Sequence, residues 1–527
     1  MYPQTNTDSP ADNTSGLNTP SSPNILQPVA LPESESVASV AWWLVLIVVI
    51  AMAARLLLFV LGPAVDMQRA GLEGSDRQIM LGHNLIAHGQ LGLNTESNQL
   101  LHRQIAGLRT ALSEAPTPQP DQLTPEIYSG PGYPTLIAAI EFLGLPMYTL
   151  ILIQCLFSVL AVLLVFAIGH AIMDSPHTAL LAATIVALHP ADIVAPNALI
   201  SQTLFATLIL TGIWLVCSKK MRTVWHCAVA GLSCGLAVLV NPLALLIGPL
   251  LVIWMCLTDP KVRTAGSAAV LMAMCLLPPT VWIARNHHVG LGLRLSSAPY
   301  VDTYFQTINA INNAENQLHP SRQQPIGTNQ LIEQLRTDRH ENEDVYTTMA
   351  RLSFERISSN PILYFKVIQL SMLRFFTGHS MADLYHELGL TYEPPAWPDR
   401  LFYWDWTIPG TDNIMTTILA ITWFTLNIAM AALTIASIAI LVWRRQWAVV
   451  LLLGGLMIYF ALTAQANGME RLRLPVLGLQ AILIAAMFTP APIREPKKKK
   501  FKNLMVENFD KPVKATPLAS ITTGRPI

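Results

Sequence analysis

The sequence predicts an all-α, polytopic membrane protein with about ten transmembrane helices. Of its 527 residues 52% are hydrophobic and only 13% are charged, whereas a soluble protein carries about 25% charged residues. The charged residues collect between long apolar segments that have almost no charge. The short intervals between these segments carry clusters of Lys and Arg, as the cytoplasmic loops of membrane proteins do.

The apolar segments are candidate spans, although several are shorter than the ~20 residues that cross a bilayer straight. Polar intervals of residues 63–134 and 286–412 interrupt the series, and both are expected as outer loops. Residues 225–257 form either two short spans hinged at Asn241-Pro242 or one broken helix with a re-entrant piece. The predicted spans are Ala41–Leu61, Met147–Met173, His177–His189, Ile200–Cys217, Trp225–Val240, Leu243–Leu257, Ser267–Ala284, Ile414–Val442, Trp447–Thr463 and Leu474–Phe488.

The basic clusters predict the orientation of the spans. Three of them lie in short loops that contain Lys219, Lys261 and Arg444, and a fourth, Lys497–Lys500, follows the last span. With the spans counted as above, all four clusters fall on one side, and the positive-inside rule makes that side the cytoplasm. An even number of spans then places both termini in the cytoplasm and both long loops outside. We expect a bacterial inner membrane as the location.

The predicted transmembrane domain, residues 40–489, lies between two tails. Residues 1–39 are rich in Pro, Ser, Asn and Thr, and residues 490–527 are basic, so both tails are predicted to be disordered. In the second outer loop, residues 330–356 favour helices and predict a small helical cap. Residues 362–376 are apolar but contain a lysine and an arginine, so we interpret them as an amphipathic helix on the outer membrane surface.

Several function classes are disfavoured. The formal net charge is zero, which gives no support to nucleic-acid binding. The six cysteines fall inside or at the edge of apolar segments, which argues against a disulfide framework or a metal cluster. No histidine spacing matches a metal-binding pattern, so we predict neither a bound metal nor another cofactor. The cysteines are Cys155, Cys217, Cys227, Cys234, Cys256 and Cys275.

Four charged residues stand just outside apolar segments on the predicted outer side: Asp76, Arg285, Arg471 and Arg473. Arginines at an outer face run against the usual charge bias. Together with a carboxylate, they predict a site for an anionic, lipid-linked substrate. The alternatives are that Asp76 only caps a short helix and that the arginines are interface anchors whose charged ends reach water.

Several motifs resemble those of one enzyme superfamily. An outer aspartate, Asp76, precedes a short helix, and a Pro-Gly-Tyr133-Pro segment precedes the second span. The motif Trp282-Ile-Ala-Arg285-Asn286 ends a later span, and Arg471-Leu-Arg473-Leu-Pro475 precedes the last one. In this order the motifs resemble the GT-C membrane glycosyltransferases. The closest resemblance is to the branch that contains the dolichyl-phosphate-mannose–protein mannosyltransferases and the bacterial aminoarabinose–lipid A transferase.

The resemblance implies a glycosyltransferase that takes a hexosyl or pentosyl group from a polyprenyl-phosphate donor. The acceptor would be a lipid, a glycan or a protein outside the cytoplasm. Arg285, Arg471 and Arg473 would bind the donor phosphate, because arginine stays charged and grips phosphate oxygens with two N–H groups. Tyr133 and Asn286 would also contact the substrate.

Asp76 is the predicted catalytic base that deprotonates the acceptor hydroxyl for an inverting, in-line displacement. Asp66 is the fallback, and Glu73 is a third candidate. A divalent cation shared by Asp76 and the donor phosphate is conceivable, but nothing in the sequence demands one.

The chain departs from the superfamily pattern at three positions. Gln202 stands where an acidic residue is common, Asn241 replaces an arginine, and Met80 replaces a tyrosine. A non-catalytic membrane subunit of an envelope-assembly complex therefore remains an alternative. A lipid or solute transporter is another, although we find no clear internal repeat and the charges sit at the ends of spans.

Overall fold

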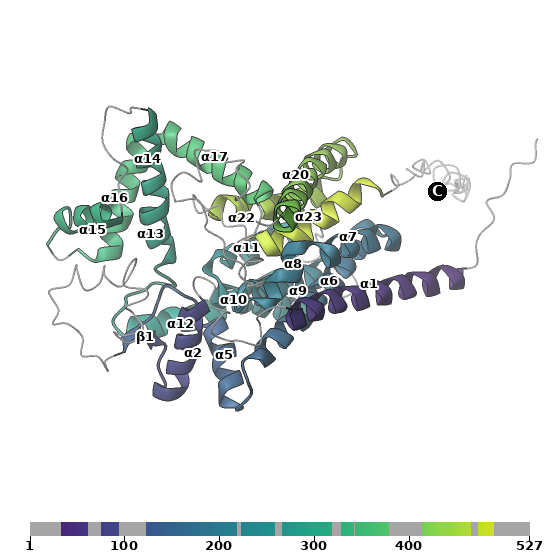
Figure 1. Ribbon diagram of the computed structural model, residues 1–527, viewed down its shortest axis with the longest axis horizontal. Helices are drawn as coiled ribbons and strands as arrows, with labels where there is room; N and C mark the ends of the chain where they lie inside the picture. The colour runs from purple at the N-terminus through teal and green to yellow at the C-terminus, as the bar shows by residue number, and fades with distance from the viewer. Residues whose placement is uncertain are drawn as a thin grey trace, which may run out of the picture.

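The computed structural model describes residues 33–61, 75–93, 123–218, 223–258, 266–318, 328–341, 343–378, 414–464 and 473–489. In these ranges the chain is helical apart from turns and two strands of two residues each. Long helices pack side by side in one bundle, and a smaller group of helices lies at one end of it (Figure 1). The predicted all-α class is confirmed.

The bundle is built from apolar helices that coincide with the ten predicted spans. They are α1 (Glu33–Leu61), α6 (Tyr148–Met173), α7 (Pro176–Leu188), α9 (Gln202–Cys217), α10 (Val224–Val240), α11 (Ile247–Thr258), α12 (Ser267–His288), α20 (Ile414–Trp443), the run of α21 (Trp447–Val449), the π-helix η7 (Val450–Gly454) and α22 (Gly455–Thr463), and α23 (Leu474–Met487).

Length decides which helices qualify as spans by themselves. Four described helices, within α1, α6, α12 and α20, are long and apolar enough to cross a membrane. A fifth span arises if α7 and the turn that follows it, which are bent by 62° at His189, are counted together. The other five apolar helices have 10–17 residues. The protein is therefore a polytopic membrane protein, and the count of ten spans stays a prediction.

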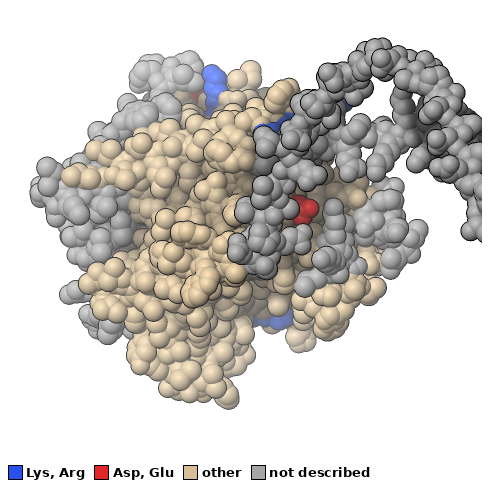
Figure 2. Space-filling model, turned by 90° about the vertical axis from the view of Figure 1, so that its right-hand side faces the viewer, with Lys and Arg blue, Asp and Glu red and all other residues tan. Residues whose placement is uncertain are grey.

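The surface of the bundle agrees with this assignment. Large apolar side chains point outward on α1, such as Trp42 at 75% and Leu57 at 59% exposure, and on α20, such as Ile435 at 71%. The end of the bundle from which α1 begins shows few charged side chains (Figure 2). Soluble proteins rarely expose so much apolar surface, whereas lipid covers it in a bilayer.

Two boundaries differ from expectation or refine it. Helix α1 begins at Glu33, inside the predicted disordered tail. Helix α10 ends at Val240, and Asn241 follows as its C-cap. The Asn241 Oδ1 accepts the Leu243 N–H at 3.1 Å, and a short 3-10 turn, η5 (Pro242–Ala244), begins there. Residues 225–257 therefore form two helices that meet at the predicted hinge. The rest of both predicted tails lies outside the described residues.

Close helix contacts depend on small residues. Helices α10 and α12 approach so closely that a Cβ on Gly231 would lie 2.2 Å from the Leu271 carbonyl oxygen. Helices in membranes use glycine in this way to bring two backbones together. A Cβ on Gly130 would lie 2.0 Å from the Leu239 carbonyl oxygen, so the loop before α5 is pressed onto the end of α10.

Elements from both predicted outer loops lie at the same end of the bundle, on the left of Figure 1. Those from the first loop form a helix, a two-strand ladder and a second helix that packs on the first. They are α2 (Ser75–His88), β1 (Gly92–Leu93), β2 (Thr124–Pro125) and α5 (Gly132–Phe142), with Gly92 paired to Pro125 in the antiparallel ladder.

The second loop forms the predicted helical cap. Its helices enclose a hydrophobic cluster of their own around Tyr304, Ile311, Leu335 and Met349. Helix α17 then runs from the cap to the bundle, and whether it lies on a membrane surface stays a prediction. The elements of the second loop are α13 (Ala298–Asp302), the π-helix η6 (Thr303–Ile308), α14 (Asn309–Leu318), α15 (Thr328–Thr337), α16 (Val345–Ser359) and α17 (Pro361–Thr377). Two short elements, α8 (Pro190–Val194) and η3 (Ala195–Asn197), form the turn that follows α7 in the bundle.

Candidate functional site

Helix α2 places a buried arginine next to the predicted base. Arg77 forms an ion pair with Glu126 at 2.6 Å, and its guanidinium lies 4.6 Å above the centre of the Tyr128 ring. The other oxygen of Glu126 accepts the backbone N–H groups of Tyr128 and Ser129. One carboxylate therefore fixes both α2 and the loop before α5. The backbone of Asp76 belongs to the first turn of α2, and its side chain lies outside the described residues.

A tyrosine and an aspartate join this loop to the cap. The Tyr128 hydroxyl donates a hydrogen bond to Asp302 Oδ1 at 2.9 Å, and Gln306 Nε2 donates to the same oxygen at 3.2 Å. Burial raises the pKa of Asp302 to about 6, although the Tyr128 hydrogen bond and the charge of Arg77 act in the opposite direction. Burial also raises the pKa of Tyr128, so its hydroxyl remains a donor.

The end of α12 brings Arg285 to the same loop. Its Nη1 donates to the Asn286 side chain at 3.0 Å and to the Glu126 carbonyl at 3.4 Å, and its Nη2 donates to the Leu91 carbonyl at 3.3 Å. The guanidinium lies 4.6 Å from the Trp282 ring centre. All these partners are uncharged, and no described carboxylate forms an ion pair with Arg285. The charge of the Glu126 carboxylate nevertheless acts on this half-buried guanidinium.

Asn286 has both ends of its amide in protein contacts. Its oxygen accepts from Arg285, and its Nδ2 donates to the Arg294 carbonyl at 2.8 Å. The side chain is fully buried. It therefore holds Arg285 in place, and its predicted contact with a substrate stays a prediction.

Tyr133 lies deeper than the sequence suggested. Its hydroxyl donates to Gln154 Oε1 at 2.7 Å, and Gln154 Nε2 donates to the carbonyls of Pro196 and Ala198. Tyr133 is completely buried. Through Gln154 it connects α5 to α6 and to the turn after α7. Tyr133 can therefore reach a substrate only if its hydrogen bond to Gln154 breaks.

Arg473 occupies a different environment, between helices of the bundle. Its Nη1 donates to the Phe376 carbonyl at 2.8 Å and its Nη2 to Asn427 Oδ1 at 2.7 Å. His189 Nε2 lies 3.3 Å from the same Asn427 oxygen, and Asn427 Nδ2 donates to the Gly378 carbonyl. Arg473 is only 4% exposed. It ties α23 to α17, to α20 and to the turn after α7.

Glu126 connects Arg77, the neighbour of Asp76, to Arg285, although 159 positions separate Glu126 from Arg285. The hydrogen bonds of Arg473 to Phe376, Gly378 and Asn427 involve none of these residues. Three predicted positions, Arg471, Asp66 and Glu73, lie outside the described residues.

Sequence reasoning missed a buried ion pair in the bundle. Arg55, in α1, donates to Asp192 Oδ2 at 2.5 Å and to the Ser158 hydroxyl at 2.6 Å. The usable signal was present, because a charge inside an apolar span normally has an opposite partner, and Asp192 stands in the short turn after the third predicted span.

The described residues also bear on metal binding. Within those ranges no three His, Cys, Asp or Glu side chains lie close enough together to hold a metal ion. A cation bound through Asp76 would use a side chain outside them, so this part of the hypothesis stays untested.

Comparisons with known proteins give a match in structure alone. No protein-family model matches the sequence, and no curated protein matches it. The chain is similar to archaeal oligosaccharyltransferase AglB from Archaeoglobus fulgidus in complex with an inhibitory peptide and a dolichol-phosphate, with 15% identity and a TM-score of 0.46. It is also similar to the apo form of the Archaeoglobus fulgidus oligosaccharyltransferase, with 14% identity and a TM-score of 0.45.

Both alignments cover 85% of this chain and 50% of the oligosaccharyltransferase chain, so this protein spans about half of each matched structure.

Proposed function

We propose that this protein is an integral membrane glycosyltransferase that moves a sugar from a polyprenyl-phosphate donor to an acceptor outside the cytoplasm. The observation that carries the proposal is Arg285. It stands at the end of an apolar helix, forms no ion pair with a described carboxylate, and is joined through Glu126 to the helix turn that contains Asp76. A cation and a carboxylate near one end of the bundle are what transfer from a lipid phosphate requires.

The chemistry follows from where the donor can lie. A prenyl tail stays in the bilayer because each buried CH₂ contributes about 0.8 kcal/mol, so the donor phosphate stays at the interface. During transfer a bond forms between the acceptor oxygen and the sugar C1 while the bond from C1 to the phosphate oxygen breaks. The acceptor proton passes to Asp76, and the released lipid phosphate is stabilised by Arg285.

Arg471 and Arg473 complete the proposed phosphate site. In the structure Arg473 donates to a carbonyl and an amide oxygen, so binding a phosphate would require it to exchange some of these contacts for phosphate oxygens. The transferred group is a hexose or a pentose, and the acceptor is a lipid, a glycan or a protein. We place the protein in a bacterial inner membrane with both termini in the cytoplasm, on the basis of the basic clusters.

Replacing Asp76 with asparagine tests the proposal. Asp76→Asn keeps the size of the side chain and its ability to cap α2, but it cannot accept a proton. We expect transfer from a short-chain prenyl-phosphate sugar to fall by about 10²–10⁴-fold, with expression and donor binding unchanged. Asp338→Asn, on the exposed surface of the cap, is the matched control and should behave like wild type. Near-normal transfer by Asp76→Asn would remove Asp76 from the mechanism.

A further inference from the structure

Buried polar atoms without partners gather where the first outer loop meets the cap. Within the described ranges, Arg77 Nε, Gln78 Oε1 and Gln306 Oε1 are buried and make no hydrogen bond. The three side chains flank one dipeptide, Tyr128-Ser129. Arg77 lies over the Tyr128 ring, Gln78 Nε2 donates to the Ser129 hydroxyl at 3.3 Å, and Gln306 reaches Tyr128 through their shared partner on the cap.

Such atoms are rare in folded proteins because burying a polar group without a hydrogen bond is costly. Here the same three side chains are held firmly by their other polar atoms. Arg77 is paired to Glu126, and both glutamine amides donate through Nε2. The unpaired atoms are therefore fixed in place, which is the arrangement of a binding site that lacks its ligand.

We propose that this loop–cap junction, formed by Arg77, Gln78, Tyr128, Asp302 and Gln306, binds the hydroxyl groups of a carbohydrate. The proposal rests on the proposed function for the source of that carbohydrate, which is either the donor's sugar or a glycan acceptor. The two sources share the same chemistry.

The balance of donors and acceptors selects this ligand class. The two glutamine oxygens need donors, and Arg77 Nε needs an acceptor. A hydroxyl group supplies both, and neighbouring sugar hydroxyls supply several at once. A phosphate would satisfy Arg77 but would face two carboxylates, Glu126 and Asp302. A metal cation would suit the oxygens but would be repelled by Arg77. A neutral polyol meets neither objection.

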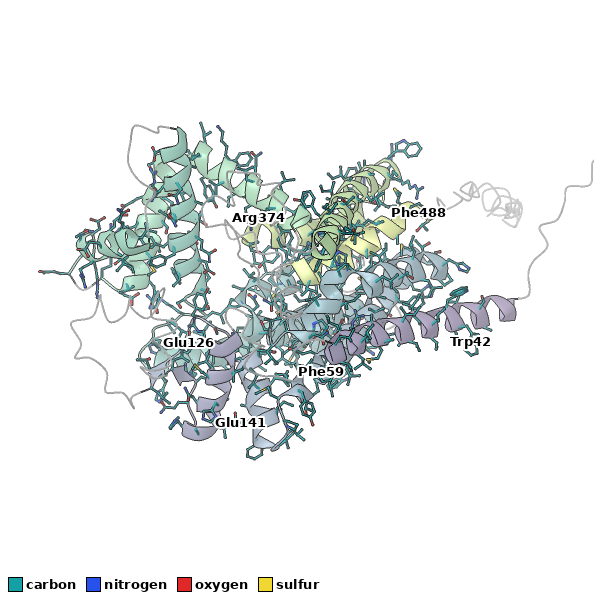
Figure 3. The ribbon with its side chains drawn as sticks, viewed as in Figure 1. Trp42, Phe59, Glu126, Glu141, Arg374 and Phe488 are labelled. Carbon is teal, nitrogen blue, oxygen red and sulfur yellow. The ribbon has the colours of Figure 1, made fainter. Side chains whose placement is uncertain are left out.

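The cap side of the junction is shaped for the same purpose. Asp302 and Gln306 stand four positions apart across the start of the π-helix η6, and π-helical turns occur frequently at functional sites. Both donors to Asp302 use Oδ1, and Oδ2 has no hydrogen-bond partner among the described residues. Glu126 lies at the foot of the cap, beside α2 (Figure 3). A sugar bound here would contact the loop and the cap together.

The test is a binding measurement on the purified full-length protein in detergent, with methyl glycosides of common hexoses and pentoses as probes. Saturation-transfer NMR reports binding without any lipid donor or transfer reaction. We expect at least one glycoside to bind the wild-type protein. Gln306→Met and Gln78→Met keep the side-chain volume but remove the acceptor, and each should weaken that binding by about tenfold or more. Gln334→Met makes the same change on the exposed cap surface and should leave binding unchanged.

A stability measurement separates lost binding from lost folding. Gln78→Met and Gln306→Met should keep a thermal transition in detergent close to that of wild type while their glycoside binding falls. Absence of glycoside binding to wild type, or equal binding by wild type, Gln78→Met and Gln306→Met, would overturn the proposal and assign the junction to ordered water alone. Glycoside binding by an Asp76→Asn protein that is inactive in transfer, or by a wild type with no transfer activity, would uphold the junction independently of the proposed reaction. A rise in KM for the donor alone or for the acceptor alone in Gln306→Met would identify which sugar binds.

Discussion

Two buried arginines, Arg55 in the bundle and Arg77 at the loop–cap junction, differ in how many of their guanidinium nitrogens form hydrogen bonds. Arg55 uses its Nε, Nη1 and Nη2 atoms, which donate to Ser158, to two backbone carbonyls and to Asp192. Arg77 pairs with Glu126 but leaves its Nε without a partner. Inside a bilayer no water is present to complete the hydrogen bonds of a side chain such as Arg55, and here the protein supplies them. Its neighbour Asn197, which donates to the Arg55 carbonyl, still has a buried Oδ1 without a partner. At the junction the requirement is relaxed, and a ligand or water can complete the network.

The same contrast separates two of the predicted phosphate ligands. Arg473 resembles Arg55, since it is buried among helices and donates to carbonyl and amide oxygens of other elements. Arg285 resembles Arg77, since both contact the loop that contains Glu126. Arg55 and Arg473 connect helices of the bundle, whereas ligand binding by Arg285 stays a prediction.

The largest effect is expected for Arg55→Leu, which leaves the buried Asp192 without its partner. Breaking a buried ion pair on one side costs about 3–5 kcal/mol, so the thermal transition in detergent should fall sharply. The double variant Arg55→Leu/Asp192→Leu removes both charges and should recover most of the loss. Arg336→Leu, on the exposed face of the cap, is the control and should change stability by about 0.5 kcal/mol or less. If Arg55→Leu alone is as stable as wild type, the pair has no structural role and the contrast fails.

A pair of smaller effects should distinguish Arg285 from Arg473. Lysine keeps the charge but loses the two-pronged geometry of arginine. Arg285→Lys should weaken binding of a short-chain prenyl-phosphate sugar by about tenfold with little change in thermal stability. Arg473→Lys should lower stability by about 1–3 kcal/mol, because buried carbonyl and amide oxygens lose their donor. Arg294→Lys, which changes an arginine between α12 and α13, is the control for the binding measurement. If both variants bind and turn over donor like wild type, the arginines are interface anchors only.

The helices were predictable from the sequence because apolar runs and their breaks are local signals. The hinge at Asn241 lies where the turn chemistry predicts it. The short helices are the exception, since 10–17 residues do not settle whether a segment crosses the membrane.

The junction was not predictable because its contacts are distant in sequence. Arg77 and Glu126 are 49 positions apart, and Tyr128 and Asp302 are 174 positions apart. No local pattern marks either pair. The position of Arg285 at the end of an apolar helix was predictable because it is a local feature, and its role in phosphate binding stays a prediction.

The smallest effect concerns pH and the contact between loop and cap. Burial raises the pKa of Asp302 to about 6, above the ~4 of an exposed aspartate. The folded protein therefore holds this proton more tightly than the unfolded chain does. The stabilisation is complete below about pH 4 and is lost as the pH rises through about 6. The cap should dock more firmly at pH 5 than at pH 7, by about 1 kcal/mol after allowance for partial exposure.

Hydrogen exchange along α13 and η6 at the two pH values, corrected for intrinsic exchange rates, measures this difference. Three groups act on Asp302: the Tyr128 hydroxyl, the Arg77 guanidinium and the Gln306 amide. None of these three changes its charge between pH 5 and 7. Asp302→Asn carries no proton to lose, so its protection should be equal at both pH values. If the variant keeps the wild-type pH dependence, another group controls the docking. If wild type itself shows no dependence, Asp302 is ionised at both pH values, and the loop–cap junction is as fully satisfied as the Arg55 network in the bundle.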